Sequence, residues 1–423
     1  MRTLVLGLGL VLLAVPGAAQ GQTLDMTVDA LVFQALADNP DLRAGRAEVE
    51  AAGGRVRQAG LRPNPILELG GQKALGPDNN LMVGFTLPLD LNGRKEGRVG
   101  VAEREVAVKR ALLADRERRL RADVRLKAGE LLAARRNLAI ADDLLQVNRE
   151  ALALVNRRVA QGAAPALDEN LALVEVNRLD ASRQLLASRV ELATLAVKAL
   201  AGLTPEAVLS IRGDLPAGPA VPEGSEHARE VLSNRPDLQL ARTEVAAAQA
   251  RVRKEEAEAR WDASVNVGYQ RQDFGYGLRG LTESGGTRPI QDVFHYFGGG
   301  VSIMLPVRNR NQGNVAAARA ETTAAERRRE FMELMARQEV AAAFAQQEAA
   351  RRALGLYERG VRDVARRNLE VVRQAYQLGR GSLLDVVAEQ RRYIEIENGY
   401  TDVLKQVYDA AVEIERAVGT TGR

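Results

Sequence analysis

Two hydrophobic patterns alternate along the chain, and the longer one predicts long helices. Apolar residues recur at spacings of three and four, for example over 186–200 and 404–418. This spacing is typical of helices that pack as coiled coils, and alanine at many of the positions permits close packing. Proline, which breaks helix interiors, is absent from 89–164 and from 307 onward. A helix over 97–161 would be roughly 95 Å long at about 1.5 Å per residue.

The shorter pattern alternates every second residue and predicts strands. In the first such segment, Leu67 and Leu69 flank Glu68. Four segments show the pattern: 66–72, 81–89, 263–271 and 298–305. We therefore expect two β-hairpins, at 66–89 and 263–306, with strands of roughly seven to ten residues.

The same landmarks occur twice in the same order, so the chain reads as a duplicated unit. Pro40-Asp41-Leu42 returns as Pro236-Asp237-Leu238, and Gly162 followed by Asp168 returns as Gly379 followed by Asp385. We expect each copy to contain a first helix, starting near Thr27 or Glu226, then a β-hairpin and a helical hairpin.

The predicted boundaries follow from these landmarks. The first copy covers 25–203, with its helical hairpin at 97–202, and the second covers 224–419, with its helical hairpin at 313–418. A segment rich in proline and glycine, 204–223, joins them as a linker.

The N-terminus has the layout of an export signal. Arg2 precedes an apolar run, and Gly17 and Ala19 fit the small positions before a cleavage site. We expect residues 1–19 to be removed on export, although the exact cleavage position stays open. No later run is apolar enough for a membrane helix, which leaves the periplasm, secretion, or insertion into the outer membrane as strands.

Composition argues against an enzyme, a metal site and a nucleic-acid binder. The 59 Lys and Arg nearly balance the 55 Asp and Glu, so no strongly basic face is expected. Cysteine is absent, and the two histidines, His227 and His295, have no metal-binding partner at ligand spacing. We place His295 in an external loop. No catalytic residue, metal site or cofactor is predicted.

Four strands cannot close a barrel, and open strand edges are not tolerated in lipid. If the strands enter the membrane, three chains would supply twelve of them, a plausible number for an outer-membrane barrel. Seven of the sixteen aromatic residues lie between 261 and 297, and we assign Trp261, Tyr269 and Phe297 to an aromatic girdle at the membrane. The alternative is that these rings form a small soluble core.

These motifs, in this order, resemble the TolC family of outer-membrane efflux channels over essentially the whole mature chain. They are Asn39-Pro-Asp-Leu and Asn234-Arg-Pro-Asp-Leu, Leu305-Pro-Val-Arg-Asn-Arg-Asn-Gln-Gly313, and Gly379-Arg-Gly-Ser-Leu-Leu-Asp385. The segment Arg55-Val-Arg-Gln-Ala-Gly-Leu-Arg-Pro-Asn-Pro65 is most similar to the cobalt–zinc–cadmium resistance, or CzcC-like, branch. One departure is that many relatives are lipoproteins, whereas this chain has no cysteine to carry lipid.

The resemblance implies an α+β membrane protein. It implies a homotrimer that completes a 12-stranded outer-membrane barrel and continues as a long α-helical coiled-coil tunnel in the periplasm. The channel would be passive and would work with a periplasmic adaptor protein and an inner-membrane pump of the resistance-nodulation-division type.

The turns between the long helices would form the periplasmic entrance. By resemblance, Gly162 and Ala163 in the first turn, and Gly379, Arg380 and Gly381 in the second, would contact the adaptor. The alternative for Gly162 and Gly379 is that they only terminate helices in the left-handed conformation. Both interpretations can hold together.

Four acids beside these turns are candidates for the entrance and its gating. Asp385 matches a family acid that rings the closed entrance. The next acid position of the family is Ala388 here, with Glu389 beside it. Asp168 is the duplicated counterpart of Asp385 and, with Glu169 beside it, could also face the entrance. A threefold ring of carboxylates would attract cations, but acids at helix starts also cap free N–H groups.

Three functions remain open. The first is a channel for efflux of divalent heavy-metal cations. The second is a duct for drug efflux or type I secretion, which a neighbouring pump gene would distinguish. The third is a soluble periplasmic scaffold or adaptor, which would extract without detergent.

Overall fold

The computed structural model describes residues 24–75, 78–215 and 235–419, which divide into two compact units. The helical unit contains the described residues of 24–39, 123–215 and 349–409, and the strand unit contains those of 40–122, 235–348 and 410–419. The predicted signal peptide at 1–19, the helix start near Glu226, and His227 lie outside the described residues.

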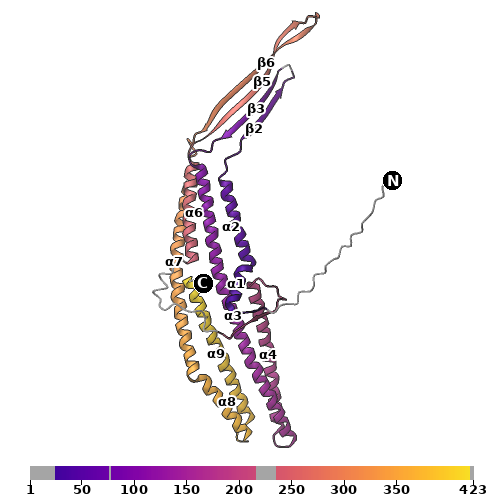
Figure 1. Ribbon diagram of the computed structural model, residues 1–423, viewed down its shortest axis with the longest axis vertical. Coiled ribbons are helices and arrows are strands. Elements are labelled where there is room, and N and C mark those ends of the chain that lie inside the picture. The colour runs from indigo at the N-terminus through magenta and orange to yellow at the C-terminus, as the bar shows by residue number, and fades with distance from the viewer. Residues whose placement is uncertain (1–23, 76–77, 216–234, 420–423) are drawn as a thin grey trace, which may run out of the picture. The chain divides into compact units, whose positions relative to one another are not determined.

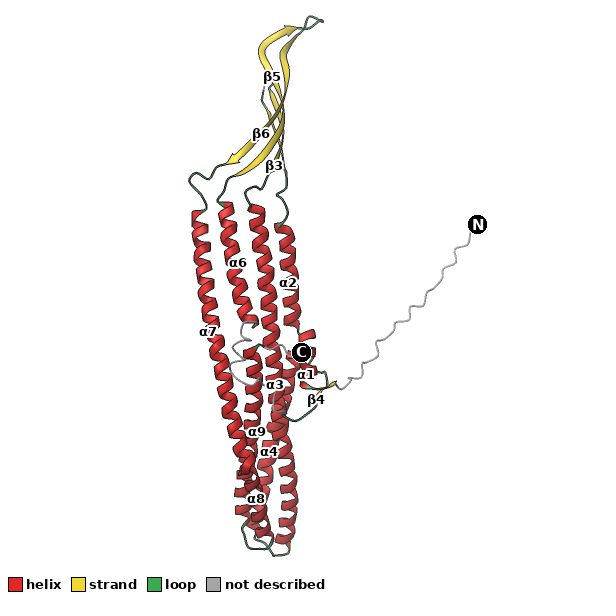
Figure 2. Cartoon of the chain, turned by 60° about the vertical axis from the view of Figure 1, so that its left-hand side comes forward, coloured by secondary structure: helices red, strands yellow, loops and turns green. Residues whose placement is uncertain are grey.

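In the strand unit, parts of four helices lie side by side (Figures 1 and 2). They belong to α2 (Pro40–Ala59), α3 (Arg94–Ala160), α6 (Pro236–Glu258) and α7 (Gln312–Leu356). Small residues set the spacing, because a Cβ at Gly45 would lie 3.0 Å from Leu113 Cδ1 and one at Gly97 would lie 3.0 Å from Lys254 Cα. Helix α3 begins within three residues of its predicted start and ends one residue before its predicted end.

The same unit carries a four-stranded antiparallel sheet in the order β2-β3-β5-β6 (Figure 1). The strands are β2 (Ile66–Lys73), β3 (Asn79–Pro88), β5 (Asp262–Leu281) and β6 (Thr287–Met304). The first hairpin has the expected length, but β5 and β6 contain 20 and 18 residues. The prediction of seven to ten residues is therefore wrong for the second hairpin.

The extra length forms a two-stranded ribbon. Pairing with β3 stops at Asp273, whereas β5 and β6 continue to pair as far as Leu281 and Thr287. Glycines and charged residues interrupt the alternation there, so the sequence resembles a loop. Cross-strand contacts such as Phe274 with Phe294, whose ring centroids are 5.7 Å apart, accompany the pairing.

His295 lies in β6, so its placement in an external loop is wrong. Its backbone pairs with Arg271, and its Nδ1 shares a 2.7 Å hydrogen bond with the Tyr269 hydroxyl. The Tyr269 ring also lies 5.1 Å from that of Phe297 between centroids. These rings explain why a polar imidazole is accommodated within a strand.

The helical unit contains α1 (Val28–Asp38), the second part of α3, α4 (Ala166–Leu200), α8 (Arg362–Gln377) and most of α9 (Leu383–Val418). Leu145 of α3 packs with Val176 and Leu179 of α4, and Ile394 of α9 joins this cluster. Among the helices in the described part of the chain, none combines the length and the apolar character that crossing a bilayer requires.

The first helix of the chain starts as predicted but is not continuous. Thr27 caps it, since its hydroxyl accepts a hydrogen bond from the Ala30 amide at 3.2 Å. Asn39 then takes a non-helical ψ of 125°, as residues before proline commonly do. The expected single helix is therefore two helices, α1 and α2, divided at Pro40.

Two further features of the fold were not predicted. The second helical hairpin contains a π-helical turn, η2 (Tyr357–Val361), with a non-helical Gly360, so α7 and α8 are separate helices. Strand β1 (Leu24–Met26) pairs in parallel with β4 (Leu209–Ile211), which lies in the segment expected to be a linker. Part of that segment is thus ordered structure.

The residue before each Pro-Asp-Leu landmark donates a side-chain hydrogen bond to a carbonyl at the end of the last helix in its own copy. We call these contacts the first and second clasps. In the first clasp, Asn39 Nδ2 donates to the Leu200 carbonyl at 3.0 Å. In the second, Arg235 Nη1 donates to the Ala417 carbonyl at 2.9 Å. A glycine with positive φ follows each of these helices: Gly202 at 69° and Gly419 at 75°.

The second clasp also contains a buried ionic network. Arg235 is 2% exposed and binds Asp237 at 2.8 Å and Glu339. Arg118 lies 3.5 Å from Asp237 and donates to the Arg416 carbonyl at 2.8 Å. Several charges therefore converge where this helix ends.

Candidate functional site

The turn after α3 is closed by a Schellman motif centred on Gly162. Gly162 has a φ of 70°. Its amide donates to Val159 O at 2.9 Å, and the Ala163 amide donates to Arg158 O at 2.8 Å. This pattern ends a helix by satisfying its last carbonyls. The expectation that Gly162 terminates a helix is confirmed.

The turn after α8 repeats this geometry at Gly379, whose φ is 71°. The Gly379 amide donates to Tyr376 O at 3.0 Å, and the Arg380 amide donates to Ala375 O at 2.8 Å. Arg380 and Gly381 are exposed. Both turns therefore present short, backbone-fixed loops to solvent.

Asp385 caps the start of α9 in a reciprocal arrangement with Ser382. The Ser382 hydroxyl accepts from the Asp385 amide at 3.2 Å and donates to Asp385 Oδ2 at 2.7 Å, and the Ser382 amide donates to that oxygen at 3.2 Å. This is a capping box with aspartate at the third helical position. The hydroxyl and the amide of Ser382 lower the pKa of Asp385, which is exposed and therefore a fixed negative charge at the turn.

Asp168 occupies the same helical position in α4 but has no such partner. The residue at the capping position is Pro165, which makes no side-chain cap. Burial raises the pKa of the Tyr376 hydroxyl, and the charge of Asp168 adds to that effect. Asp168 therefore acts on a side chain of α8, while Asp385 acts on its own helix. Glu169, beside it, is half-buried.

Glu389 is less available than Asp385. Its side chain is 13% exposed and lies 3.1 Å from Arg392 one turn along α9. Its Oε1 atom is buried without a hydrogen-bond partner in the described part of the chain. Of the four predicted acids, Asp385 is thus the most exposed, and Asp168, Glu169 and Glu389 are half-buried.

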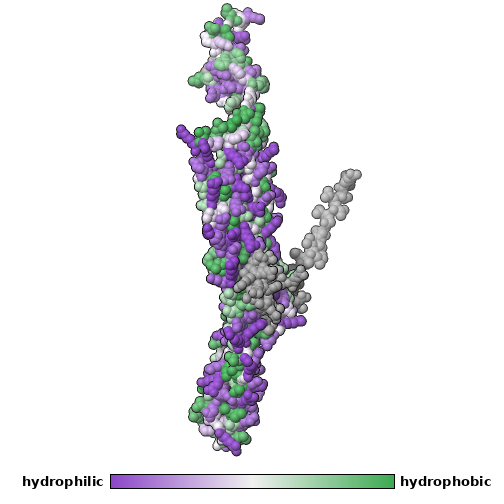
Figure 3. Space-filling view, turned by 90° about the vertical axis from the view of Figure 1, so that its left-hand side faces the viewer, coloured by the Kyte–Doolittle hydropathy of each residue, from purple (hydrophilic) through white to green (hydrophobic). Residues whose placement is uncertain are grey.

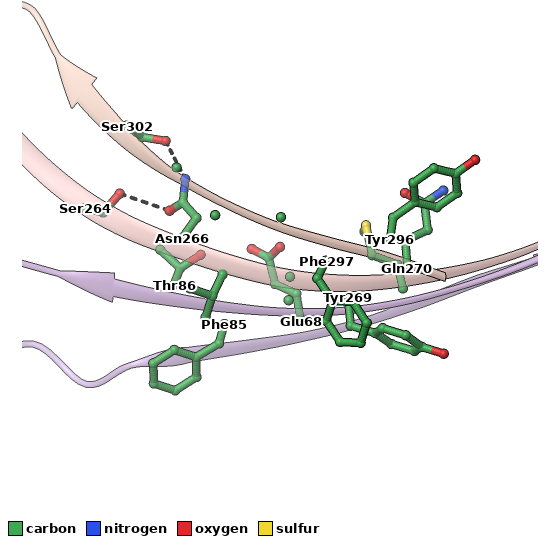
Figure 4. Close-up of a pocket in the computed structure, with 17 residues that line it drawn as sticks. Glu68, Phe85, Thr86, Ser264, Asn266, Tyr269, Gln270, Tyr296, Phe297 and Ser302 are labelled. Atoms are coloured by element: carbon green, nitrogen blue, oxygen red, sulfur yellow. Dashed lines mark hydrogen bonds between the residues drawn. The ribbon is translucent and has the colours of Figure 1, made fainter. Parts of the chain in front are cut away.

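One face of the β-sheet is polar and concave, and the sequence analysis did not single it out. A hollow of about 630 Å³ lies over it. Asn266 Nδ2 donates to the Ser302 hydroxyl at 2.7 Å, and Figure 4 shows Glu68, Asn266 and Ser302 on this side of the strands. Phe85, Tyr269 and Phe297 point the other way (Figure 4). Alternation along each strand places the polar and the aromatic side chains on opposite faces. Only the register between strands brings the polar side chains of different strands together.

The predicted girdle residues occupy the sheet and its junction with the helices. Tyr269 and Phe297 are cross-strand partners in the middle of β5 and β6. Trp261, 44% exposed, precedes β5. Leu305 and Val307, just after β6, are also exposed, and Figure 3 shows hydrophobic residues gathered where the strands meet the helices. Trp261 is therefore at the junction, and the other two residues lie farther along the sheet.

Comparison with known proteins shows the family. The model of the family described as "Outer membrane efflux protein" matches residues 31–203 and 228–420. The chain therefore belongs to the outer membrane efflux protein family. It is an outer-membrane efflux channel protein, as the resemblance of its motifs indicated.

Individual relatives agree with this membership. The cobalt-zinc-cadmium resistance protein CzcC of Cupriavidus metallidurans is 25% identical over 394 residues, which cover 93% of this chain and 90% of that protein. The solved structure of CusC matches with a TM-score of 0.75 at 19% identity, covering 96% of this chain and 95% of that one. VceC from Vibrio cholerae matches with a TM-score of 0.71 at 21% identity, covering 93% of this chain and 96% of that one. The two structures establish the fold.

Membership fixes the general class of activity. The family consists of efflux channels rather than enzymes, in keeping with the expectation for this chain. It also carries with it the outer-membrane location, the homotrimer and the adaptor and pump partners that the resemblance implied. Among the described residues, no group of three His, Cys, Asp or Glu side chains is placed to hold a metal ion.

Proposed function

We propose that this chain forms the outer-membrane channel of a resistance-nodulation-division efflux system that exports divalent heavy-metal cations. The observation that carries the proposal is the 25% identity with a cobalt-zinc-cadmium resistance protein over 93% of the chain. The relative aligns over nearly its whole length, so the likeness is not confined to one part of the channel. Conduction is passive, and the pump supplies the energy.

The two turns and their acids form the periplasmic end of this channel in our proposal. Asp385, Glu389, Asp168 and Glu169 make the entrance acidic, and Gly162, Ala163, Gly379, Arg380 and Gly381 meet the adaptor. The exposure of Asp385 and Arg380 supports these roles. We further propose that the export signal is 1–19 and that the two copies are 25–203 and 224–419.

The substrate class is tested with a deletion strain and a panel of zinc, cobalt, cadmium, nickel, copper, silver and lipophilic drugs. We expect sensitivity to divalent metals that the wild-type gene reverses. Sensitivity to drugs alone would reject the metal assignment and favour a drug-efflux duct. A protein that extracts from membranes without detergent would instead favour a soluble scaffold.

The role of Asp385 is tested by Asp385→Asn in the same strain. This change removes the charge. It keeps the backbone N–H of residue 385, which donates to the Ser382 hydroxyl, so α9 still starts at the same place. We expect the metal concentration that stops growth to fall by roughly two- to tenfold, because the entrance attracts fewer cations. Asp363→Asn is the matched control, since Asp363 is an exposed acid of α8 paired with Arg366. Equal effects of the two changes would argue against an entrance role.

The adaptor contact can be tested by thiol cross-linking, because the sequence contains no natural cysteine. Ala163→Cys and Arg380→Cys each place one thiol at a turn. We expect both to cross-link to the adaptor in cells, and Ser284→Cys, in the turn between β5 and β6, to remain unlinked. Cross-linking at Ser284 and at neither periplasmic turn would contradict the assignment.

A further inference from the structure

The register of the sheet places one carboxylate at the end of a row of glycines. Glu68 of β2 pairs with Gly84 of β3, Gly84 pairs with Gly268 of β5, and Gly268 pairs with Gly298 of β6. The four residues form one continuous cross-strand row. Three of its four positions have no side chain, so Glu68 is the only group that projects from it.

This row belongs to the polar face of the sheet. The adjacent row on that face contains Thr86, Asn266 and Gly300, and the row on the other side contains Met82, Gln270 and Tyr296. None of these is charged. In strands that cross an outer membrane, the polar face lines the lumen and the apolar face meets lipid.

Where β3 pairs with β5, the other acids do not compete with Glu68, and Asp292, on the same face, belongs to the ribbon that β5 and β6 form beyond this pairing. Arg271 and Asp273 alternate onto the opposite face and bind each other at 3.1 Å. Asp262, at the helical end of β5, accepts hydrogen bonds from the Leu91 and Ala263 amides and lies 3.7 Å from Arg94. Its charge is therefore compensated.

Glu68 itself is uncompensated and faces open space. Within the described residues it has no hydrogen-bond donor or cation as a partner, and its side chain is exposed. A Cβ added at Gly84 would lie 3.5 Å from both Glu68 Cβ and Oε2, so the carboxylate extends across the glycine. Figure 4 shows it directed into the hollow of about 630 Å³ over the polar face.

We propose that Glu68 is a charge-selecting residue of the channel lumen, which forms a ring of three carboxylates that favours cations within the barrel itself. The inference rests on the proposed channel function and on the homotrimer, whose threefold axis places the three copies at one height. The glycine row leaves the space beside each carboxylate open, so a hydrated cation can pass close to the charge without losing its water.

The physical effect is a local negative potential. Three like charges around a pore with low-dielectric walls raise the concentration of cations and lower that of anions. Glu68 belongs to β2, whereas the acids at the periplasmic turns belong to α4 and α9, so the two sets of charges can be changed independently.

The test is the reversal potential of the purified trimer in planar lipid bilayers under a potassium chloride gradient. We expect Glu68→Gln to lower the potassium-to-chloride permeability ratio by roughly two- to tenfold, and Glu68→Lys to reverse the preference. Glu68→Asp keeps the charge and should retain cation preference. The difference between wild type and Glu68→Gln should shrink near 1 M salt, where the screening length is about 3 Å.

Glu283→Gln is the matched control, because it removes the same charge from the exposed turn between β5 and β6. It should leave the permeability ratio unchanged. If wild type conducts and Glu68→Gln has the same permeability ratio, the assignment of Glu68 is overturned while the channel remains. If the wild-type trimer forms no conducting pores, the proposed channel function fails first.

Discussion

The two clasps occupy equivalent places in the duplicated chain but are built from different chemistry. In the first, a neutral amide of Asn39 holds the end of α4. In the second, the buried guanidinium of Arg235 holds the end of α9 and is itself bound by carboxylates. Both copies thus have a side-chain donor to a carbonyl at the end of their last helix, but the donor is neutral in the first copy and charged in the second.

The difference in charge determines how much stability is lost when each clasp is broken. A neutral hydrogen bond contributes about 1 kcal/mol net, so losing one is tolerable. Removing one partner from a buried ion pair costs about 3–5 kcal/mol, because the other charge stays buried and unpaired. The second clasp should therefore be the more sensitive one to substitution and to pH.

The largest expected effect comes from Arg235→Met. This change leaves Asp237, which is 4% exposed, without its main partner, and we expect a loss of about 3–5 kcal/mol. The equivalent change at the first clasp, Asn39→Ala, should cost only about 1 kcal/mol. Folded trimer yield and the temperature of unfolding in detergent measure both.

A double variant sharpens this comparison. Replacing Asp237 by Leu in the Arg235→Met background removes the stranded charge, so part of the stability should return. A double variant that is less stable than Arg235→Met alone would show that Asp237 has a role beyond pairing with Arg235.

The next largest effect is the loss of stability when alanine replaces Gly202 or Gly419, the glycines that follow the two helices held by the clasps. At Gly202 a Cβ would lie 2.8 Å from the Asp38 carbonyl oxygen, a backbone atom, whereas at Gly419 it would lie 3.2 Å from Arg235 Cγ. Both have positive φ, which costs about 1–2 kcal/mol for alanine. We expect Gly202→Ala to exceed that cost because the backbone must move, and Gly419→Ala to stay close to it.

Gly162→Ala is the control for conformation alone. Its φ is also positive, at 70°, but a Cβ there would meet nothing within 4 Å. Unfolding temperatures should therefore fall least for Gly162→Ala and most for Gly202→Ala. The reverse order would show that the close approach to Asp38 is not what requires glycine.

The smallest effect is a pH dependence confined to the second clasp. Burial favours the neutral form of Asp237, but hydrogen bonds from Arg235 and the charges of Arg235 and Arg118 hold the pKa of this carboxyl below its usual value. The stabilisation is therefore complete above the unfolded pKa of about 3.9 and is lost as pH falls through the lower, folded value. The first clasp has no titrating group in its hydrogen bond.

Hydrogen exchange can read this difference locally. The Leu238 amide donates to Asp237 Oδ1 at 2.9 Å, so its protection should fall at acid pH. The Leu203 amide, which donates to Lys198 O at 2.9 Å, should change less. Asp237→Asn should abolish the contrast, and equal acid sensitivity of both amides in wild type would contradict it.

The sequence predicted the features that depend on local pattern. Proline-free coiled-coil spacing located α3 almost to its ends, because helix formation there depends on neighbours three and four positions away. Gly162 and Gly379 were recognised as helix terminators for the same reason, since a Schellman turn is fixed by adjacent residues.

Features that depend on distant partners were missed. The three residues of β1 are too few to show a period, and they are a strand only because Leu209–Ile211 lies beside them. The residues after Phe274 contain three glycines and an arginine before Leu281, yet pairing with β6 extends them as a strand. Pro40 was noticed as a landmark but not as a helix break.

The candidate site divides in the same way. Asp385 could be predicted as a candidate because it lies near a turn. Its hydrogen bond with the Ser382 hydroxyl was missed, although Ser382 is only three residues away in the sequence. The row from Glu68 through Gly84 and Gly268 to Gly298 could not be found, since its members are brought together only by strand register.

The parallel pairing of β1 with β4 has a consequence for how the protein is made. An exported chain crosses the inner membrane from its N-terminus, so Leu24–Met26 arrives long before its partner Leu209–Ile211. The first strand must remain unpaired in the periplasm until half of the polypeptide has followed it. Closure of this small sheet therefore marks the moment at which translocation has delivered one complete copy of the duplicated unit.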